Sequence, residues 1–191
     1  MAALISQAGQ GSKEVAPITH AEIMEALKKQ KNGKAPGPDG LPAEYYKEPE
    51  EVLFQPFKKL LEYVEEEGKL PATWTEATIS LIHKENTEGK EIQNYRPISL
   101  LNVDYKIYAT ILATRMKRIL IHLIHQDQSG FLPKRHMKNN IRIVLNSLEY
   151  YEAHPEKQMA MIFLDAEKAF DNLDWNFLLY TLETLQVGKD F

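Results

Sequence analysis

The 191-residue sequence contains no cysteine. Disulfides, thiolate metal sites and cysteine nucleophiles are therefore excluded, and an intracellular location, in the cytoplasm and the nucleus, is the expectation. Long apolar runs are missing too, since no segment approaches the ~20 apolar residues of a membrane-spanning helix. The first 17 residues lack the basic and apolar regions of a signal peptide, and we expect them to form a flexible leader. The sequence thus predicts a soluble protein without a membrane partner.

Positive charge is in the minority, because 23 Lys and Arg stand against 27 Asp and Glu, for a net charge of -4. This balance argues against indiscriminate binding of nucleic acid. The charge is unevenly spread, however: residues 50–91 hold ten acidic residues against five Lys or Arg, whereas residues 104–142 hold eight Lys or Arg against two acidic residues. The basic segment could face a phosphate backbone, although a solvated helix face is the commoner cause of such a pattern.

Apolar spacing and turn residues predict a mixed α+β fold. Thr19 and Glu22 form a capping box that opens the first helix, and the glycines and prolines of residues 32–42 exclude regular structure there. Two β-branched, apolar segments around the turn-rich ENTEGKE predict a hairpin, whose second strand is expected to end at Pro97. The predicted elements are helices over 20–30, 53–64, 104–121, 141–154 and 175–185, a hairpin over 77–97 and one buried strand within 158–165.

Asp165 directly follows the apolar run QMAMIFL. A carboxylate at the end of a buried strand is either a satisfied structural acid or a ligand at the edge of a site. A tight turn that exposes Asp165 together with the carbonyl of Ala166 favours the second interpretation, because both are hard oxygen donors that suit Mg²⁺. Nucleotidyl transfer uses two cations ~3.5–4 Å apart, so one carboxylate is insufficient and a second acidic segment is required.

Five motifs follow one another along the chain: GKAPGPDGLPAEYYK, ISLIHK, NYRPISLLNVDYKIYATILATRM, HQDQSGFLPKRHMKNNIR and IFLDAEKAFDNLDW. In the same order, they resemble the reverse transcriptases of LINE-type, non-long-terminal-repeat retrotransposons, from Ile18 to about Val187. The resemblance implies a right-hand polymerase with fingers over 18–155 and the start of a palm over 156–191. It also implies RNA-directed DNA synthesis from deoxynucleoside triphosphates on an RNA template and a DNA primer, with Mg²⁺ as the cofactor.

The resemblance assigns roles in the expected palm. Asp165 matches its first catalytic, metal-binding carboxylate, and the carbonyl of Ala166 is the second oxygen donor beside it. Phe170 matches the bulky residue below the incoming sugar, which would clash with a ribose 2′-hydroxyl. The resemblance therefore implies a preference for deoxynucleotides.

The resemblance also places cations in the expected fingers. Arg96 matches the arginine that reaches the triphosphate, and its planar fork suits phosphate oxygens. Lys84 is the second cation, with Lys90 as a rival because of the length of the hairpin. The alternative for both lysines is that they are solvated residues of a hairpin.

Template contact is expected in the loop that matches the family's QxGF motif and in the segment after it. The alternative for each residue is an ordinary role in a loop or a helix cap. Three histidines nearby, His122, His125 and His136, are predicted to lie on the surface, because their spacing and the lack of thiolates do not make a zinc site. The candidates for nucleic-acid binding are Gln128, Gly130, Arg135, Asn139, Asn140 and Arg142.

The matched family carries two further acids in a tight hairpin, whereas the 191 residues contain no adjacent Asp-Asp pair. We therefore expect a truncated piece that is inactive alone. It is either part of an active polymerase or a catalytically dead remnant that acts as a nucleic-acid or protein binding module. We also expect exposed apolar surface on the 175–185 helix and on the strand before Asp165, because the rest of their sheet is missing.

Overall fold

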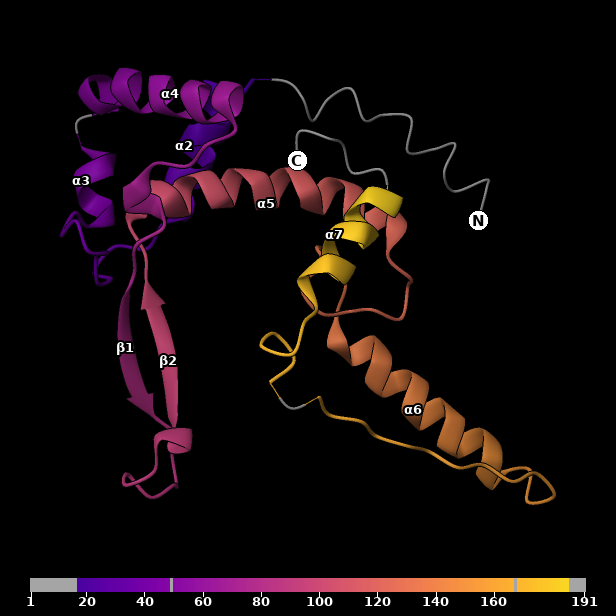
Figure 1. Cartoon of the computed structure of the whole chain (residues 1–191). Coiled ribbons are helices and arrows are strands. Elements are labelled where there is room, and N and C mark those ends of the chain that lie inside the picture. The colour runs from indigo at the N-terminus through magenta and orange to yellow at the C-terminus, as the bar shows by residue number, and fades with distance from the viewer. Residues whose placement is uncertain (1–16, 49, 167, 186–191) are drawn as a thin grey trace. The chain divides into compact units, whose positions relative to one another are not determined.

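The computed structural model describes residues 17–48, 50–166 and 168–185, so the predicted leader lies outside it except for Pro17. The chain divides into two compact units, and the boundary between Thr114 and Arg115 lies within one long helix. We call residues 17–114 the first unit and the described residues from Arg115 onward the second unit. The described elements combine helices with one antiparallel hairpin, as the mixed fold class predicts. In chain order they are α2 (His20–Lys29), α3 (Ala43–Lys47), α4 (Glu50–Glu67), the 3-10 turn η2 (Ala72–Trp74), β1 (Thr78–His83), η3 (Ile92–Asn94), β2 (Tyr95–Leu100), α5 (Val103–Leu123), α6 (Met137–Glu152) and α7 (Trp175–Thr184), shown in Figure 1.

Helix α2 begins where the capping box predicts. The Thr19 hydroxyl accepts a hydrogen bond from the N–H of Glu22 at 3.3 Å, and the Glu22 carboxylate accepts from the N–H of Thr19 at 3.0 Å. Ile18 and Ile23, on either side of the box, are both buried in one core cluster. The helix ends with the extended Gln30 as its C-cap. The predicted start and end of this helix are confirmed.

The loop after α2 is irregular, as predicted, and α3 holds it in place. The Glu44 carboxylate accepts a hydrogen bond from the N–H of Gly33 at 2.7 Å. This bond holds the pKa of the Glu44 carboxyl below its ordinary value. The Lys47 ammonium donates to the carbonyl of Gln30 at 2.7 Å. One short helix therefore fastens both the end of α2 and the turn that follows it.

The core of the first unit lies among α2, α3, α4 and α5. Helix α4 ends as predicted at Gly68, whose φ of +63° suits glycine and whose N–H donates to the carbonyl of Val64 at 3.0 Å. Burial of these apolar faces supplies most of the stability of such helices. The most deeply buried side chains are Leu61, Trp74, Ile107 and Ile111.

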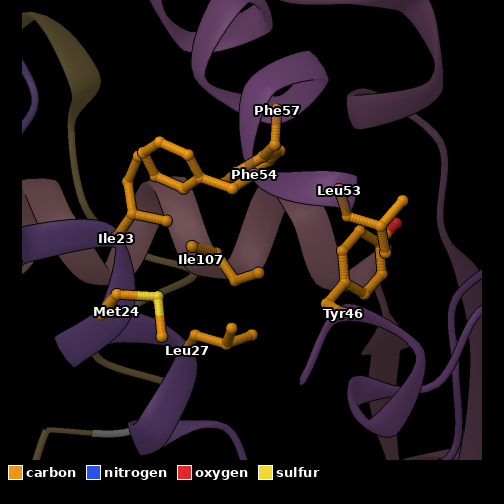
Figure 2. Close-up of a pocket in the computed structure, with 8 residues that line it drawn as sticks. All are labelled: Ile23, Met24, Leu27, Tyr46, Leu53, Phe54, Phe57 and Ile107. Carbon is orange, nitrogen blue, oxygen red and sulfur yellow. The ribbon is translucent and has the colours of Figure 1, made fainter. Parts of the chain in front are cut away.

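A small apolar hollow lies within this core. It measures about 20 Å³, close to the space that one water molecule needs, so it is a packing gap and not a ligand pocket. Tyr46 lines it, and burial, reinforced by the carboxylates of Asp104 and Asp39, raises the pKa of this tyrosine well above its ordinary value. Its hydroxyl therefore stays protonated at neutral pH. Figure 2 shows the lining residues, which are Ile23, Met24, Leu27, Tyr46, Leu53, Phe54, Phe57 and Ile107.

Strands β1 and β2 form the predicted antiparallel hairpin, but β2 continues through Pro97 to Leu100. The expectation that the strand ends at the proline is wrong. The N–H of Lys84 donates to the carbonyl of Asn94 at 2.7 Å, and hydrogen-bonded pairs alternate along an antiparallel ladder. Pro97, opposite Leu81, therefore falls at a non-hydrogen-bonded pair. Its missing N–H lies on the outer edge, where no partner is lost.

Helix α5, with 21 residues, is the longest described helix and begins and ends close to the predicted bounds. Ile107 and Ile111 lie on its buried face, as predicted. Within the described ranges, no helix has both the length and the apolar character needed to cross a membrane.

Helices α6 and α7 form as predicted, although neither has a buried residue. Helix α7 opens with Asp174, whose carboxylate accepts from the N–H of Asn176 at 2.8 Å and of Phe177 at 3.1 Å. The predicted exposed apolar surface on the second of these helices is confirmed. Its large exposed side chains are Trp175, Phe177, Leu179 and Tyr180.

The buried strand predicted within 158–165 is wrong. Residues 158–166 have no regular structure, and most of their large apolar side chains are exposed, with Leu164 at 91%. A strand needs a neighbouring strand for its backbone hydrogen bonds. In the described part of the chain the only sheet is the β1–β2 pair, and this segment does not pair with it.

Candidate functional site

The hairpin of the first unit brings two predicted cations onto one face. In the register, Arg96 lies opposite Ile82, and side chains of a cross-strand pair share a face. Lys84 is two residues after Ile82, so alternation returns it to the same face. The hydrogen bond from Lys84 to Asn94 continues the ladder to this residue. The hairpin therefore presents Arg96 and Lys84 as diagonal neighbours.

The two candidate lysines of the hairpin differ in their surroundings. The Lys84 ammonium donates to the carbonyl of Gln93 at 2.7 Å, and the residue is partly buried. Lys90 lies in the connecting loop and is exposed. The geometry favours Lys84 as the companion of Arg96, because its head is held close to the ladder.

The loop that connects the strands is held by the last side chain of the loop and the first side chain of β2. The Asn94 amide donates to the carbonyl of Glu88 at 2.7 Å, and the Tyr95 hydroxyl donates to the carbonyl of Gly89 at 3.0 Å. On the face opposite the cations, the rings of Tyr95 and His83 lie 5.1 Å apart. These contacts give the exposed hairpin a defined end.

In the second unit, the predicted template loop joins α5 to α6. Gln128 and Gly130 are in its first half, and Gly130 is exposed. Phe131 adopts a φ of +62° and is 87% exposed. A phenylalanine in the left-handed region is uncommon and carries a backbone cost. The loop thus turns a large aromatic ring outward.

Arg135 holds this loop against the end of α5. Its guanidinium donates to the carbonyls of Ile124 and Gln128, each at 2.8 Å, and to that of Ile121 at 3.3 Å. It also donates to the carbonyl of His125. The last carbonyls of a helix lack partners within the helix, and a cation there also offsets the helix dipole. Sequence reasoning missed this capping role, since no local pattern links Arg135 to a helix that ends 12 residues earlier.

The other predicted nucleic-acid residues lie on the first two turns of α6. The Asn140 amide donates to the carbonyl of Asp127 at 3.1 Å, which ties the helix to the loop. Asn139 and Arg142 are exposed. The loop and the start of α6 are therefore joined by a hydrogen bond. The three nearby histidines, His122, His125 and His136, are exposed, as predicted.

Asp165 and Ala166 lie at the end of the irregular segment and are both exposed. The tight turn comes slightly later, where the N–H of Asp171 donates to the carbonyl of Lys168 at 2.9 Å. Phe170 lies within this turn and is 81% exposed. Among the described residues, Asp165 and Phe170 do not belong to a sheet that would fix the directions of their side chains.

The described residues do not form a complete metal centre. No three His, Cys, Asp or Glu side chains of residues 17–48, 50–166 and 168–185 gather in a way that could hold a metal ion. Asp165 offers a hard oxygen donor of the kind that divalent cations prefer. One carboxylate is not enough to hold the two cations of nucleotidyl transfer.

Sequence reasoning assigned no role to Asn102, which is 2% exposed. Its side chain accepts from the N–H of Asp39 and donates to the carbonyl of Thr73. A polar residue just before a helix is ordinarily interpreted as an N-cap. Only the three-dimensional structure shows that this side chain bonds to residues distant in sequence.

A family model described as reverse transcriptase (RNA-dependent DNA polymerase) matches residues 82–190. The Transposon TX1 uncharacterized 149 kDa protein of Xenopus laevis is 35% identical over 175 residues, which cover 92% of this chain and 13% of that protein. The RNA-directed DNA polymerase from mobile element jockey of Drosophila melanogaster is 28% identical over 179 residues, covering 92% of this chain and 19% of that protein.

A third relative is the Retrovirus-related Pol polyprotein from type-2 retrotransposable element R2DM of Drosophila melanogaster. It is 31% identical over 159 residues, which cover 82% of this chain and 14% of that protein. The chain thus spans less than a fifth of the length of these relatives. The matches confirm the resemblance to RNA-directed DNA polymerases of LINE-type retrotransposons.

Proposed function

Because the chain belongs to the reverse transcriptase family, we propose that it is part of an RNA-directed DNA polymerase. In this proposal residues 18–155 form the fingers of a right-hand polymerase and residues 156–191 begin its palm. The substrates of the whole enzyme are deoxynucleoside triphosphates, an RNA template and a DNA primer. The single observation that supports the proposal best is the shared face of Arg96 and Lys84 on the hairpin.

In the proposed nucleotide site, the hairpin binds the triphosphate. The Arg96 guanidinium offers two parallel N–H donors to phosphate oxygens, and the Lys84 ammonium adds a point charge beside it. Both groups offset the charge on the phosphates and hold the nucleotide in one orientation. Lys90, in the loop, stays solvated and does not contact the triphosphate.

The proposed template contact is formed by the loop after α5 and the start of α6. Gln128, Gly130, Asn139, Asn140 and Arg142 would contact the strand through its phosphates and sugars, which supply affinity without sequence information. Arg135 contributes by holding the loop in place through its bonds to the end of α5.

The proposed palm residues act on the sugar and on a metal ion. Phe170 excludes a ribose 2′-hydroxyl by its bulk, and Asp165, with the carbonyl of Ala166, supplies oxygen ligands. Reverse transcriptases generally use a divalent metal, and we propose Mg²⁺, which neutralises phosphate charge when bound.

Direct binding of a fluorescent deoxynucleoside triphosphate to the 191-residue chain tests this function. We expect Arg96→Ala to weaken binding roughly tenfold, the effect of losing about one charge-assisted hydrogen bond. Lys84→Ala should weaken binding less, and Lys90→Ala, the matched control in the same hairpin, should leave it unchanged. Equal effects of Arg96→Ala and Lys90→Ala would refute the nucleotide site. Binding of RNA without any binding of the triphosphate would instead support the alternative of a nucleic-acid binding module.

A further inference from the structure

The hairpin of the first unit is attached to its helices only at one end. Both faces of the strands carry exposed apolar side chains, including Ile79 and Leu81 on one face and Ile82 and Ile98 on the other. Figure 1 shows the two strands extending away from the helices of the same unit. A two-stranded ribbon with little burial has little stability of its own. Its direction must therefore be set where it joins the helices.

The end of β1 at this junction is fixed by an aromatic side chain. Trp74 precedes β1 by four residues and is 2% exposed. Its ring lies 5.3 Å from that of Tyr108 and 5.9 Å from that of Tyr105, both on α5. Burial of an aromatic ring of this size makes a large contribution to the stability of the packed core. The chain that enters the hairpin is thus packed against α5.

The end of β2 at the junction is fixed by Asn102. Its amide donates to the carbonyl of Thr73 at 3.0 Å, beside the buried tryptophan. Its side-chain oxygen accepts from the N–H of Asp39 at 3.2 Å. The backbone carbonyl of Asn102 accepts from the N–H of Lys106 at 3.2 Å. This hydrogen bond lies at the start of α5. One buried amide therefore connects the entry of the hairpin, its exit and the loop after α2.

Gly37 allows the loop after α2 to reach this amide. A Cβ atom placed on Gly37 would lie 2.2 Å from the Asn102 side-chain oxygen and 2.4 Å from its backbone nitrogen. No Cβ atom tolerates such distances from other atoms. The loop can therefore lie this close to Asn102 only because Gly37 has no side chain. The loop is thereby a third attachment of the hairpin to the helices.

We propose that Asn102 is a positioning residue that sets the direction of the hairpin and so holds Arg96 and Lys84 where they meet the triphosphate. Asn102 does not contact the nucleotide; it acts through the attachment of β2. A buried amide suits this task, because its NH2 group donates and its oxygen accepts, so one side chain bonds two segments in defined directions. The part of the proposal that concerns the triphosphate rests on the proposed function, whereas the part that concerns direction does not.

The direction of the hairpin can be measured without any nucleotide. Because the chain has no cysteine, Glu88→Cys in the hairpin loop and Lys28→Cys on α2 provide two unique sites for spin labels. Double electron–electron resonance on the full chain should give one narrow distance distribution. Asn102→Ala should broaden it, and so should Gly37→Ala, which acts from the opposite side of the contact. The matched control Asn146→Ala, at an exposed position of α6, should leave it narrow.

Asn102→Asp keeps the volume and the acceptor but removes the donor to Thr73, and it serves if the alanine variant does not fold. An unchanged, narrow distribution in folded Asn102→Ala and Gly37→Ala would overturn the proposal. This result is independent of the triphosphate, so it separates the failure of the positioning role from the failure of the proposed function.

A double-mutant cycle with the fluorescent triphosphate tests the second part. If Asn102 acts through Arg96 and Lys84, the variant Asn102→Ala should weaken binding severalfold, and the losses of Asn102→Ala and Arg96→Ala should be less than additive in the double variant. A purely structural loss would instead add to the loss at Arg96. Additive losses, or an unaffected affinity in Asn102→Ala while Arg96→Ala lowers it, would refute a role in positioning the nucleotide site.

Discussion

The first unit has a packed core, whereas the second unit has helices without one. Apart from Leu132, every buried apolar side chain of the described residues belongs to the first unit. Helices α6 and α7 have no buried residue at all. The helices of the second unit nevertheless form, because a helix satisfies its backbone hydrogen bonds internally. The segment before Asp165 does not form a strand, because a strand needs a partner. A local sequence pattern can therefore produce a helix alone, whereas a strand requires a neighbouring strand.

Two isoleucines provide the most direct test of the difference in packing between the two units. Ile107→Ala in α5 removes a side chain that is 1% exposed, and Ile143→Ala in α6 removes one that is 53% exposed. We expect the first change to lower the free energy of unfolding by about 2–5 kcal/mol, because it leaves a cavity in the core. The second should cost no more than about 0.5 kcal/mol. Urea denaturation measures both, and equal losses would mean that α6 is packed as tightly as α5.

Hydrophobic dye binding tests whether the apolar face of α7 is accessible. The variant Phe177→Ser/Leu179→Ser removes two exposed apolar side chains of α7 and should lower the fluorescence of a bound hydrophobic dye. Asn176→Ser, on the same helix, is the control and should not change it. If the double variant binds as much dye as the parent chain, the apolar face of α7 is not accessible in solution.

Salt dependence tests the proposed phosphate contact of Arg142. If about four phosphates are contacted, binding of single-stranded RNA should weaken with salt, with a slope of log K against log salt of about -3. Arg142→Ala should flatten this slope by roughly 0.7, because it removes one phosphate contact. Lys59→Ala, an exposed cation of the acidic segment, should not. A slope that is indifferent to Arg142 would reduce the basic segment to a solvated surface.

Arg135→Ala should act differently from Arg142→Ala. Its guanidinium is bonded to four carbonyls at and after the end of α5, so its removal leaves these groups without their cap. We expect faster amide hydrogen exchange in the last turn of α5 and in the loop to α6. Exchange rates as slow as in the parent chain would show that the loop is held by other contacts.

The smallest expected effect concerns Glu44 and pH. The bond from Gly33 lowers the pKa of the Glu44 carboxyl in the folded chain, so its contribution to stability is present above the ordinary pKa of 4.5. It is lost as the pH falls through the lowered folded value. Glu44→Gln should therefore reduce stability slightly at pH 6 and should make the loss of stability below pH 4.5 less steep. An acid transition with the same steepness in both proteins would contradict this assignment.

The elements that the sequence predicts correctly are those whose signals are local. The capping box at Thr19 and the apolar spacing of α5 act within one or two turns, and the structure confirms both. The β-branched segments of the hairpin are neighbours in the sequence and pair across the loop between His83 and Tyr95. For Pro97, the local rule that proline interrupts strands fails, because its outcome depends on which pair of the ladder the proline occupies.

The contacts that sequence reasoning misses connect residues far apart in the chain. Arg135 bonds to the end of α5, and Asn102 bonds to Asp39, 63 residues earlier. Neither residue type nor spacing predicts such pairs. The predicted metal ligand Asp165 and the predicted gate residue Phe170 stay predictions, because their roles depend on groups that a local pattern cannot place.

Pro97 also has a consequence for self-association. A two-stranded sheet has two open edges, and each can recruit a strand from another molecule. On the outer edge of β2, the outward-facing positions are Tyr95, Pro97 and Ser99, which follow from the register. A strand that docked there would find no donor at Pro97, and the N–H of Tyr95 already donates to the carbonyl of Ile92, so a ladder could not extend along this edge. The proline therefore opposes aggregation through this edge.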